Sequence, residues 1–569
     1  MSAQHSSVAD ALAAAIERHP ERPAIETADG VVTFREFGRL VTEFAHELRT
    51  LSSPGEFIGI EAVRTPASII AMAAALRAER PFVFLDPRDS ASSNHAKVAS
   101  LFVAWIAETS AGASGPVLVP TPTQWRAADE PTGGAVVPLE DRVGYAIHTS
   151  GSTGEPKCVL VSAAPLAGVI HDHVRALELG PESRTLQFAR LTFDGCLTEI
   201  LWTLTAGACL VVLGEEHLSP GAVLQATLEK HRVTHLKTTP YALTATDPTT
   251  AMSLRHVING GGACRPAVVR KWTAHTDFHN AYGTTESTVC NLLSAPLNPD
   301  DCTDAVPLGT VVGDCGLEVA QLPGGPATGA GDALRGELVI TGPSVAIGYL
   351  TSQGLRRFAE GPANRVYRTG DIVEVRDGQY YFVERLDRQL KVRGYRLDPG
   401  EIESAACRLD TVVEAAVDAE AYDGDDPSAA DALVCYYQGG ASPRELRTHL
   451  EAVLDPYKVP SVLHQVEALP YTRNGKVDRD ALRARRQQSG AAGHEAGPAE
   501  QVLALVRRLT GVADAGVEDN FFDLGGDSAS TVILVNKLKD LGWMDAGVRD
   551  VLRAENLKVL VDHVRERGL

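Results

Sequence analysis

The chain has 569 residues, of which 44% are hydrophobic and 22% are charged, and its formal net charge is −20. This length predicts several domains with sizeable cores, and the composition is that of a globular protein rather than a disordered or fibrous one. The acidic balance argues against a protein that coats nucleic acid, which would need positive charge facing the phosphates.

The cysteines and the apolar segments indicate the cellular compartment that we expect for the protein. The nine cysteines show no CxxC pair and no close Cys/His spacing, which argues against a disulfide scaffold or a zinc ribbon and fits a reducing compartment. The N-terminus lacks the basic end and long apolar core of a signal peptide. The longest apolar runs, near Ile69–Leu76 and Ala208–Leu213, are too short to cross a bilayer. We therefore expect a cytoplasmic protein that does not insert into a membrane.

In the first half of the chain, short apolar runs alternate with helical stretches. The runs cover residues 57–63, 81–86, 185–189, 208–214 and 256–260. Thr65 is a suitable N-cap and Pro66 a suitable first residue for a helix over 66–77, and a further helix is expected over 221–231. This alternation predicts an α/β architecture with parallel sheets covered by helices on both faces.

The second half of the chain contains two candidate domain boundaries. Residues 384–401 are charged and punctuated by glycine after the strand-like run 379–383, and residues 487–498 are small and polar, as in a flexible linker. The apolar residues of 499–569 recur at helical spacing, which predicts a small helical bundle.

The segment 145–162 carries the clearest chemical signal. An apolar strand runs into a stretch of hydroxyl-bearing residues and glycines that ends at Lys157, and this stretch consists of Thr149, Ser150, Gly151, Ser152, Thr153 and Gly154, followed by Glu155 and Pro156. Glycines let backbone N–H groups approach an anion, hydroxyls add donors and a lysine adds a positive charge. We predict a phosphate-binding loop, although its spacing is not that of the common P-loop.

This loop resembles that of the adenylation domains of nonribosomal peptide synthetases, which belong to the adenylate-forming superfamily. Further motifs follow the family order, at 32–37, 76–87, 191–200, 280–288, 336–350, 367–371, 385–403 and 469–479, and residues 521–530 are similar to a peptidyl carrier protein. The resemblance implies an α/β multidomain protein. It would have a large N-terminal lobe (1–386), a small α+β C-terminal lobe (387–486), a flexible linker (487–498) and an all-α four-helix carrier domain (499–569).

The resemblance also implies an ATP site. Tyr282 would stack on adenine, with Asn280, Gly261 and Gly283 nearby. Thr285 and Glu286 would face the phosphates, and Glu286 would hold Mg²⁺, since carboxylates are suitable ligands for this ion. Asp371 would accept hydrogen bonds from both ribose hydroxyls, Arg385 would approach the ribose or a phosphate, and the hinge between the lobes would be Asp387. Two positions depart from the family pattern, Thr284 for the usual Pro and Glu384 for the usual Gly.

The implied reaction needs little acid–base machinery, because the carboxylate of the substrate is already a nucleophile. Mg²⁺, Lys157, Lys476 and the loop donors would offset the repulsion between this carboxylate and the α-phosphate of ATP. Ser528 lies at the start of a helix expected over 528–539, a favourable place for a phosphate ester, and would carry 4′-phosphopantetheine.

The family lines its amino-acid pocket from fixed motif positions, which here are Asp194, Gly195, Thr198, Lys237, Ile258, Gly260, Ala281, Val289 and Cys290. Asp194 would bind the substrate's α-ammonium. A lysine at 237 paired with a threonine at 198 resembles aspartate- and asparagine-activating domains, so we expect L-aspartate, L-asparagine or a close derivative, with aspartate first because an anion best satisfies a buried ammonium. The alternative is that Lys237 faces solvent and the substrate is small and neutral.

The expected partners are a phosphopantetheinyl transferase, a condensation or tailoring enzyme that takes the loaded amino acid, and a small MbtH-like activator, which accompanies many such domains. The competing interpretations are an acyl-CoA or aryl-acid ligase of the same superfamily and a non-catalytic binding protein. His171 and His173 are expected to be surface residues rather than metal ligands, because alternate residues on a helix do not share a face.

Overall fold

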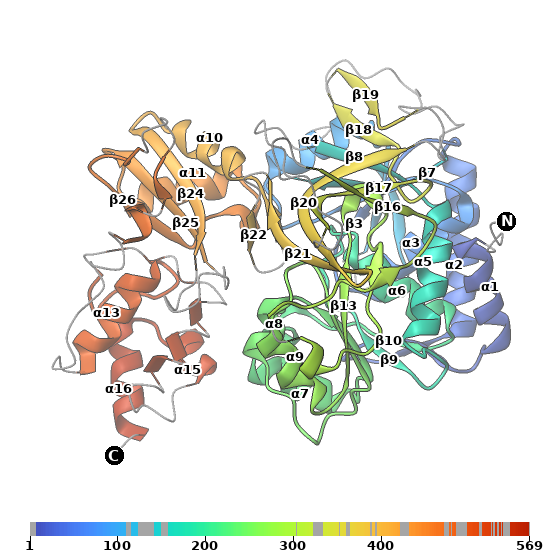
Figure 1. Cartoon of the computed structure of the whole chain (residues 1–569), viewed down its shortest axis with the longest axis horizontal. Helices are drawn as coiled ribbons and strands as arrows, with labels where there is room; N and C mark the ends of the chain where they lie inside the picture. Colours follow the sequence, from blue (N-terminus) through green and yellow to red (C-terminus); the bar gives the residue numbers. More distant parts are fainter. Residues whose placement is uncertain are drawn as a thin grey trace. The chain divides into compact units, whose positions relative to one another are not determined.

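The computed structural model describes residues 7–567 except 110–114, 123–141, 150–156, 303, 322–333, 352, 360–364, 387–389, 393–394, 421–431, 472–476, 480, 485–497, 511, 513–514, 525, 527–529, 532–533, 536 and 539–546. These described residues divide into two compact units, one within residues 1–387 and the other within residues 388–569 (Figure 1). None of the described helices is long and apolar enough to cross a membrane.

Two large sheets form the framework of the first unit. The 9-stranded sheet has the order β15 (Thr310–Val311), β14 (Leu292–Leu293), β13 (Asp277–Tyr282), β12 (His256–Asn259), β11 (His235–Thr238), β9 (Arg184–Leu186), β10 (Cys209–Val211), β1 (Pro23–Glu26) and β2 (Val31–Thr33). The 8-stranded sheet has the order β19 (Gly354–Arg357), β18 (Gly348–Thr351), β8 (Lys157–Ser162), β7 (Val143–Thr149), β4 (Phe82–Leu85), β3 (Ile58–Glu61), β5 (Trp105–Glu108) and β6 (Val117–Pro120).

The prediction of parallel sheets is right for the central strands and wrong for the edges. β1, β10, β9, β11, β12 and β13 pair in parallel, as do β7, β4, β3 and β5. β2, β14, β15, β6, β8, β18 and β19 pair antiparallel at the edges. Hairpin neighbours such as β7 and β8 are joined by connections too short for a parallel crossover, which needs a dozen or more residues.

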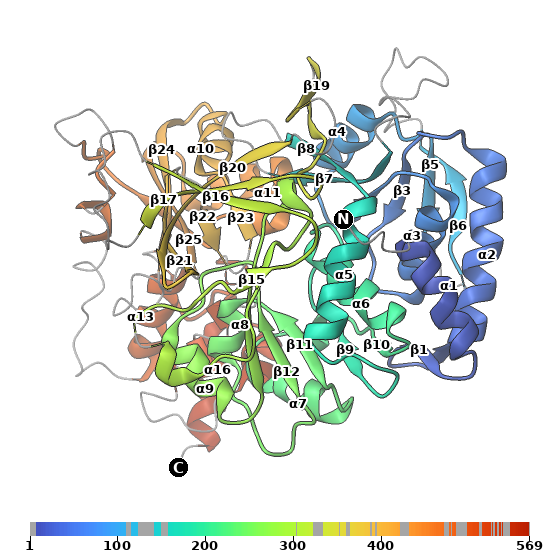
Figure 2. The same cartoon turned by 45° about the vertical axis from the view of Figure 1, so that its right-hand side comes forward.

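Helices pack between and around these sheets (Figure 2). They are α1 (Val8–Arg18), α2 (Phe34–Leu51), α3 (Pro66–Ala78), α4 (Ala91–Leu101), α5 (Ala164–Ala176), α6 (Gly195–Thr205), α7 (Ala222–Lys230), α8 (Pro240–Ala245) and α9 (Pro266–Thr273). One hydrophobic core joins α2, α3, α5 and α6 to strands of both sheets, through residues such as Ile58 and Ile258. The N-cap prediction for α3 is confirmed, because the Thr65 hydroxyl accepts a hydrogen bond from the Ser68 N–H.

A smaller sheet completes the first unit. Its order is β16 (Gly316–Ala320), β17 (Leu334–Thr341), β20 (Val366–Arg376) and β21 (Gln379–Arg385), all antiparallel. A hydrophobic cluster of this sheet includes Tyr282 at the end of β13. The small sheet is thereby packed against the carboxyl end of a central strand, where ligands of α/β proteins commonly bind.

The second unit combines a small α+β part with helices near the C-terminus. A hairpin of β22 (Leu390–Val392) and β23 (Tyr395–Leu397) precedes a 3-stranded sheet of β24 (Val412–Glu420), β25 (Ala432–Gly439) and β26 (Val462–Gln465), with α10 (Pro399–Cys407) and α11 (Pro443–Val453). The helices α13 (Pro498–Thr510), α15 (Val548–Arg553) and α16 (Leu557–Arg567) follow. The expectation of mixed α/β lobes followed by helices is confirmed.

Candidate active site

The hairpin of β7 and β8 brings the two ends of the predicted phosphate loop together. Thr149 lies opposite Lys157 in the hairpin register, and the Thr149 hydroxyl donates a hydrogen bond of 3.4 Å to the Lys157 carbonyl oxygen. Several predicted site residues lie outside the described residues, namely Ser150, Gly151, Ser152, Thr153, Gly154, Asp387, Lys476 and Ser528. The hairpin therefore fixes where the loop begins and ends.

Tyr349 links the lysine at the end of this loop to the predicted magnesium ligand. The Lys157 Nζ lies 5.4 Å from the centre of the Tyr349 ring, and the Tyr349 hydroxyl donates to Glu286 Oε1 over 2.9 Å. Burial and then the charge of Glu286 raise the pKa of Tyr349, so the phenol stays a neutral donor. Sequence reasoning did not single out Tyr349, and its only signal was its place in the motif at 336–350.

Glu286 itself is held in a short 3₁₀ turn, η4 (Thr285–Ser287), directly after β13. The Glu286 side chain is 2% exposed, and its backbone carbonyl accepts from the Ala346 N–H over 2.8 Å. The turn closes tightly, because a Cβ on Gly283 would lie 2.3 Å from the Val289 carbonyl oxygen. A glycine is therefore required where the chain turns from β13 toward Glu286.

A second polar cluster forms around Asp371 on β20. The Tyr282 hydroxyl donates to Asp371 Oδ2 over 2.6 Å, and the Arg385 guanidinium pairs with Asp371 Oδ1. Arg385 lies directly opposite Asp371 in the β20–β21 register and also donates to the Thr369 carbonyl oxygen over 3.2 Å. Asp371 is 0% exposed. Three predicted nucleotide-site residues are thus brought together, with both oxygens of the carboxylate already bonded within the protein.

Asn280 lies on β13, and Gly261 lies in the segment after β12. The Asn280 Oδ1 accepts from Asn259 Nδ2 over 2.9 Å, and the Asn280 Nδ2 donates to the Pro307 carbonyl oxygen over 2.9 Å. Gly261 has a φ of 78°, a conformation that favours glycine. The Asn280 side chain is therefore locked between two neighbouring segments.

Asp194 stands at the N-terminus of α6, yet its side chain does not cap the helix. Its Oδ2 atom is buried and has no hydrogen-bond partner among the described residues. Burial raises the pKa of this carboxyl, while a hydrogen bond with Thr285 and the charge of Lys237 oppose that rise. A buried carboxylate oxygen without a partner is costly, so this atom suits an incoming cationic donor.

Lys237 on β11 points toward the first turn of α6. Its Nζ donates to the Thr198 hydroxyl over 2.6 Å and to the Gly195 carbonyl oxygen over 3.4 Å. The same nitrogen lies 5.8 Å from the centre of the Trp202 ring, a cation–π contact that sequence reasoning did not foresee. The structure therefore brings Lys237, Thr198, Gly195 and Asp194 into one cluster.

Of the remaining predicted pocket residues, Ile258 and Ala281 lie on the strands β12 and β13, and the others lie in the segments that follow these strands. Ile258 on β12 lies opposite Lys237 in the sheet register and is fully buried. A Cβ on Gly260 would lie 3.1 Å from the Lys237 Cε, so glycine leaves room for the lysine stem. Ala281 is on β13 and buried; Cys290 is buried beyond the turn, and burial raises the pKa of its thiol to about 12. Val289, with a φ of 68°, precedes it.

Neutral histidines lie on the neighbouring strands β11, β12 and β13, namely His235, His256 and His279. His256 Nδ1 and His279 Nε2 are 3.1 Å apart, and His235 and His256 stack with ring centroids 5.0 Å apart. Since His279 Nδ1 must donate to the Ser294 carbonyl oxygen (2.9 Å), His279 Nε2 accepts and His256 Nδ1 donates. Burial lowers the pKa of all three rings, that of His235 to about 4.

The prediction of two surface histidines on α5 is wrong for one of them. His171 is exposed, but His173 is 1% exposed, contacts Trp202 with ring centroids 5.3 Å apart and bonds to the Val169 carbonyl oxygen over 2.7 Å. The spacing of the two histidines places their rings on different faces of α5, but the sequence alone does not show that one of these faces packs against α6. Burial lowers the pKa of His173 to about 4.

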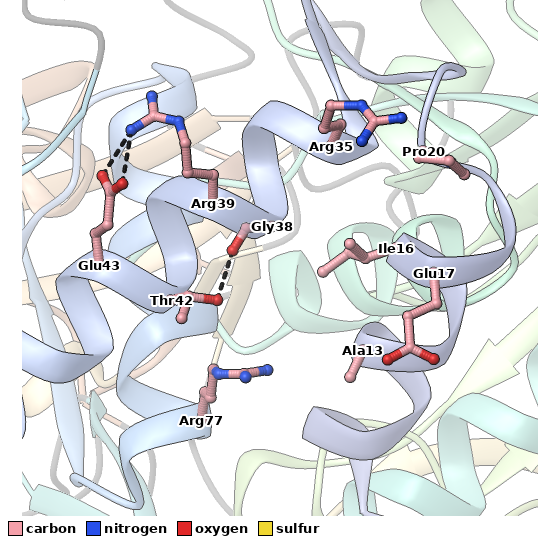
Figure 3. Close-up of a pocket in the computed structure, with 10 residues that line it drawn as sticks. All are labelled: Ala13, Ile16, Glu17, Pro20, Arg35, Gly38, Arg39, Thr42, Glu43 and Arg77. Carbon is pink, nitrogen blue, oxygen red and sulfur yellow. Dashed lines mark hydrogen bonds and ion pairs between the residues drawn. The ribbon is translucent and has the colours of Figure 1, made fainter.

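A groove of about 630 Å³ lies elsewhere, between α1 and α2 (Figure 3). Arg39 and Arg35 both line the groove. Arg39 pairs with Glu43 over 2.7 Å, and Arg35 pairs with Glu21, which is not one of the lining residues. None of the predicted site residues lines this groove. It is therefore separate from the candidate active site.

Comparison with protein families gives three matches along the chain. Residues 12–350 match the AMP-binding enzymes, residues 401–476 match the C-terminal domain of AMP-binding enzymes, and residues 500–564 match the phosphopantetheine attachment site. The matches follow the order of the expected lobes and carrier domain.

Related proteins come from natural-product biosynthesis. The chain is 32% identical to Novobiocin biosynthesis protein H of Streptomyces niveus, over 93% of this chain and 91% of that protein. It is 32% identical to the probable non-canonical nonribosomal peptide synthetase CymA of Salinispora arenicola (strain CNS-205) and 30% identical to Bacitracin synthase 3 of Bacillus licheniformis. These matches cover 97% of this chain, but the chain spans only 7% and 9% of the two synthetases.

Solved structures share the fold over most or nearly all of the chain. Holo-PA1221, a nonribosomal peptide synthetase protein with adenylation and carrier domains bound to a vinylsulfonamide inhibitor, has a TM-score of 0.79 at 25% identity, covering 99% of this chain and 97% of that one. The Vibrio cholerae adenylation domain AlmE shares the fold, with a TM-score of 0.72 at 20% identity over 86% of this chain and 100% of that one. The chain therefore belongs to the AMP-binding enzymes, as an adenylating ligase of the nonribosomal peptide synthetase type with a phosphopantetheine carrier domain.

Proposed function

We propose that this protein activates L-aspartate, L-asparagine or a close derivative as an aminoacyl adenylate and loads it as a thioester onto the phosphopantetheine arm of Ser528. The single observation that supports this substrate is the Lys237–Thr198 hydrogen bond of 2.6 Å beside Asp194, whose Oδ2 has no hydrogen-bond partner among the residues that the structure describes. The Lys237 ammonium and the Asp194 carboxylate lie in one cluster. The carboxylate would bind the α-ammonium of the amino acid, and the lysine would bind its polar β-substituent.

ATP and Mg²⁺ are general requirements of AMP-binding enzymes, and the donor set here fits them. The buried Glu286 carboxylate is a hard oxygen ligand suited to Mg²⁺, and Lys157 supplies positive charge at the end of the phosphate loop. Adenine would lie near Tyr282, Asn280, Gly261 and Gly283, and the ribose near Asp371 and Arg385. Because both oxygens of Asp371 are already bonded, ribose binding would add to or displace the contacts from Tyr282 and Arg385.

In the proposed first step, a carboxylate oxygen of the amino acid attacks the α-phosphorus of ATP. A new P–O bond forms, the bond to the β-phosphate oxygen breaks, and pyrophosphate leaves with that electron pair. Lys157, Lys476 and the hydroxyls of the phosphate loop stabilise the charge that gathers on the phosphate. When attached to Ser528, phosphopantetheine supplies the thiol that accepts the aminoacyl group as AMP leaves.

The large and small lobes (1–386 and 387–486), the linker (487–498) and the carrier domain (499–569) would each take one part of this cycle, with Asp387 as hinge. A phosphopantetheinyl transferase would modify Ser528, and a condensation or tailoring enzyme would take the loaded amino acid. A small MbtH-like activator is a further proposed partner.

Amino-acid-dependent pyrophosphate exchange tests the substrate, with all common amino acids compared at one concentration. Aspartate or asparagine should give the highest rate, and a different leading amino acid would refute the pocket assignment. Intact-mass analysis after incubation with a transferase, ATP and the amino acid should show the aminoacyl mass on the pantetheinylated chain. A Ser528→Ala protein is the matched control and should keep exchange while gaining no mass.

A further inference from the structure

The strand β18 connects two parts of the candidate active site that lie far apart in the sequence. It pairs antiparallel with β8, the strand that begins at Lys157, and Tyr349 lies opposite Val159 in that register (Figure 1). Just before β18, the Ala346 N–H donates to the Glu286 carbonyl oxygen over 2.8 Å. This segment of the chain therefore contacts both the end of the phosphate loop and the turn that carries the predicted magnesium ligand.

The side chain of Tyr349 contacts the charged groups of both parts. The centre of its ring lies 5.4 Å from the Lys157 Nζ, and its hydroxyl donates to Glu286 Oε1 over 2.9 Å. The first is a cation–π contact and the second is a hydrogen bond to a carboxylate, which is stronger than one between neutral groups. Because the aromatic ring is rigid, the position of one charged group is tied to that of the other.

Aromatic neighbours hold the Tyr349 ring in one orientation. The Phe358 ring meets it edge-on, with centroids 5.1 Å apart and an interplanar angle of 70°, and Phe358 meets Tyr367 in the same way at 5.4 Å and 66°. The Phe358 N–H also donates to the Ile347 carbonyl oxygen over 3.0 Å, which fixes the backbone of this pair. Contacts within the protein therefore set the direction of the Tyr349 hydroxyl.

The two groups that Tyr349 contacts would act on the same ligand, since Glu286 would hold Mg²⁺ and Lys157 would bind the phosphates of ATP. Loss of a donor that orients a metal-binding carboxylate generally costs about 10- to 100-fold in metal affinity. A lysine loses much rotamer freedom when it binds a phosphate, and a contact with an aromatic face reduces that loss by ordering the side chain beforehand.

We propose that Tyr349 is a positioning residue for the metal ligand and the phosphate-loop lysine together. Its hydroxyl orients the Glu286 carboxylate for Mg²⁺, and its ring holds the Lys157 ammonium where the phosphate loop ends. Tyr349 acts through these two residues and takes no part in the bonds that form or break. This inference rests on the proposed function, in which Glu286 is the magnesium ligand.

The first experiment removes the hydroxyl and keeps the ring. Titration calorimetry on the full chain measures the affinity for α,β-methylene-ATP, which cannot form an adenylate, with and without Mg²⁺. In Tyr349→Phe the gain in affinity that Mg²⁺ gives should fall to about a tenth, while the affinity without Mg²⁺ changes less than about twofold. The matched control is Tyr437→Phe, which removes a buried hydroxyl that donates to the Ala441 carbonyl oxygen over 2.9 Å and should change neither value.

The second experiment removes the ring as well. In Tyr349→Leu the affinity for the analogue without Mg²⁺ should also fall, by about three- to tenfold, because Lys157 loses its aromatic contact. The control is Tyr381→Leu, which removes a ring whose centre lies 4.9 Å from the Arg376 guanidinium and should leave both affinities unchanged. If Tyr349→Leu does not fold, the phenylalanine variant decides by itself.

The outcomes separate this role from the site on which it depends. A Tyr349→Phe protein that keeps the full gain from Mg²⁺, or that loses affinity for the nucleotide and the amino acid equally, overturns the positioning role. If Glu286→Gln loses the gain while Tyr349→Phe keeps it, the proposed magnesium ligand stands without Tyr349. If Glu286→Gln keeps the gain, the proposed ligand is wrong, and the role of Tyr349 falls with it.

Discussion

Two polar regions of the first unit use the same residue types in opposite ways. Around Asp371, both carboxylate oxygens bond to protein groups, Tyr282 and Arg385, and the side chain is fully buried. Around Asp194, one buried oxygen has no partner within the described part of the chain, although Lys237 acts on the same carboxyl. A satisfied buried pair stabilises its surroundings, whereas an unsatisfied charge is tolerated where a ligand supplies the partner. The contrast supports our proposal that the charged substrate binds in the α6–β11 region.

The largest expected effect is a loss of folding stability at acidic pH. His173 and His235 both have a pKa of about 4 against a usual 6.5, so protonation favours the unfolded chain. Their contribution is fully present above pH 6.5 and is lost as pH falls toward 4, by about 2 kcal/mol for each ring between pH 7 and pH 5. Urea unfolding of the full chain, followed by tryptophan fluorescence, should show this loss.

A His173→Phe variant should lose less stability over the same pH interval, because one titrating ring is gone. Equal pH slopes for the variant and the unaltered protein would show that His173 is not held neutral beside α6.

Removing the cation of the pocket should abolish the proposed preference. In Lys237→Met the Thr198 and Gly195 contacts are lost, and kcat/KM for aspartate should fall at least about a hundredfold, equivalent to about 3 kcal/mol. Pyrophosphate exchange measures this, and ATP affinity should change less than about twofold. The control is Lys271→Met, a lysine on α9 that pairs with Asp247. If Lys237→Met retained aspartate activation, Lys237 would not bind the substrate.

The two aspartates should respond oppositely to the same substitution. Asp371→Asn leaves the Arg385 guanidinium, whose side chain is 10% exposed, without its counter-charge and should lower the free energy of unfolding by about 3 kcal/mol. Asp194→Asn removes a carboxylate whose pKa is raised by burial and should leave stability unchanged or slightly higher at pH 8, while amino-acid-dependent exchange is lost. Thermal unfolding and exchange on both variants test the contrast. A loss of stability in Asp194→Asn would show that its carboxylate is already satisfied.

Two glycines give the smallest effects. In Gly260→Ala the new Cβ crowds the Lys237 stem, so KM for the amino acid should rise about two- to tenfold with little change in stability. Gly370 has a φ of 72° beside Asp371, so Gly370→Ala should cost about 1 kcal/mol of stability. Thermal unfolding and substrate titration separate the two outcomes, and a stability loss confined to Gly260→Ala would contradict the comparison.

Local patterns in the sequence predicted much of the framework. The apolar runs at 57–63, 81–86 and 256–260 contain the strands β3, β4 and β12, since they are too short for a helix, and Thr65 with Pro66 starts α3 as expected. The motifs in their order identified the family. These features depend on neighbours in sequence, which is why they can be recognised without a fold.

The tertiary structure decided which charges meet. Tyr349 reaches Glu286 across 63 positions of the chain, and Lys237 reaches Thr198 across 39, so no local pattern could show either contact. The same holds for the burial of His173, whose ring contacts Trp202 from a different helix. Electrostatic energy depends on distance in space and on burial, and only the packed fold determines both.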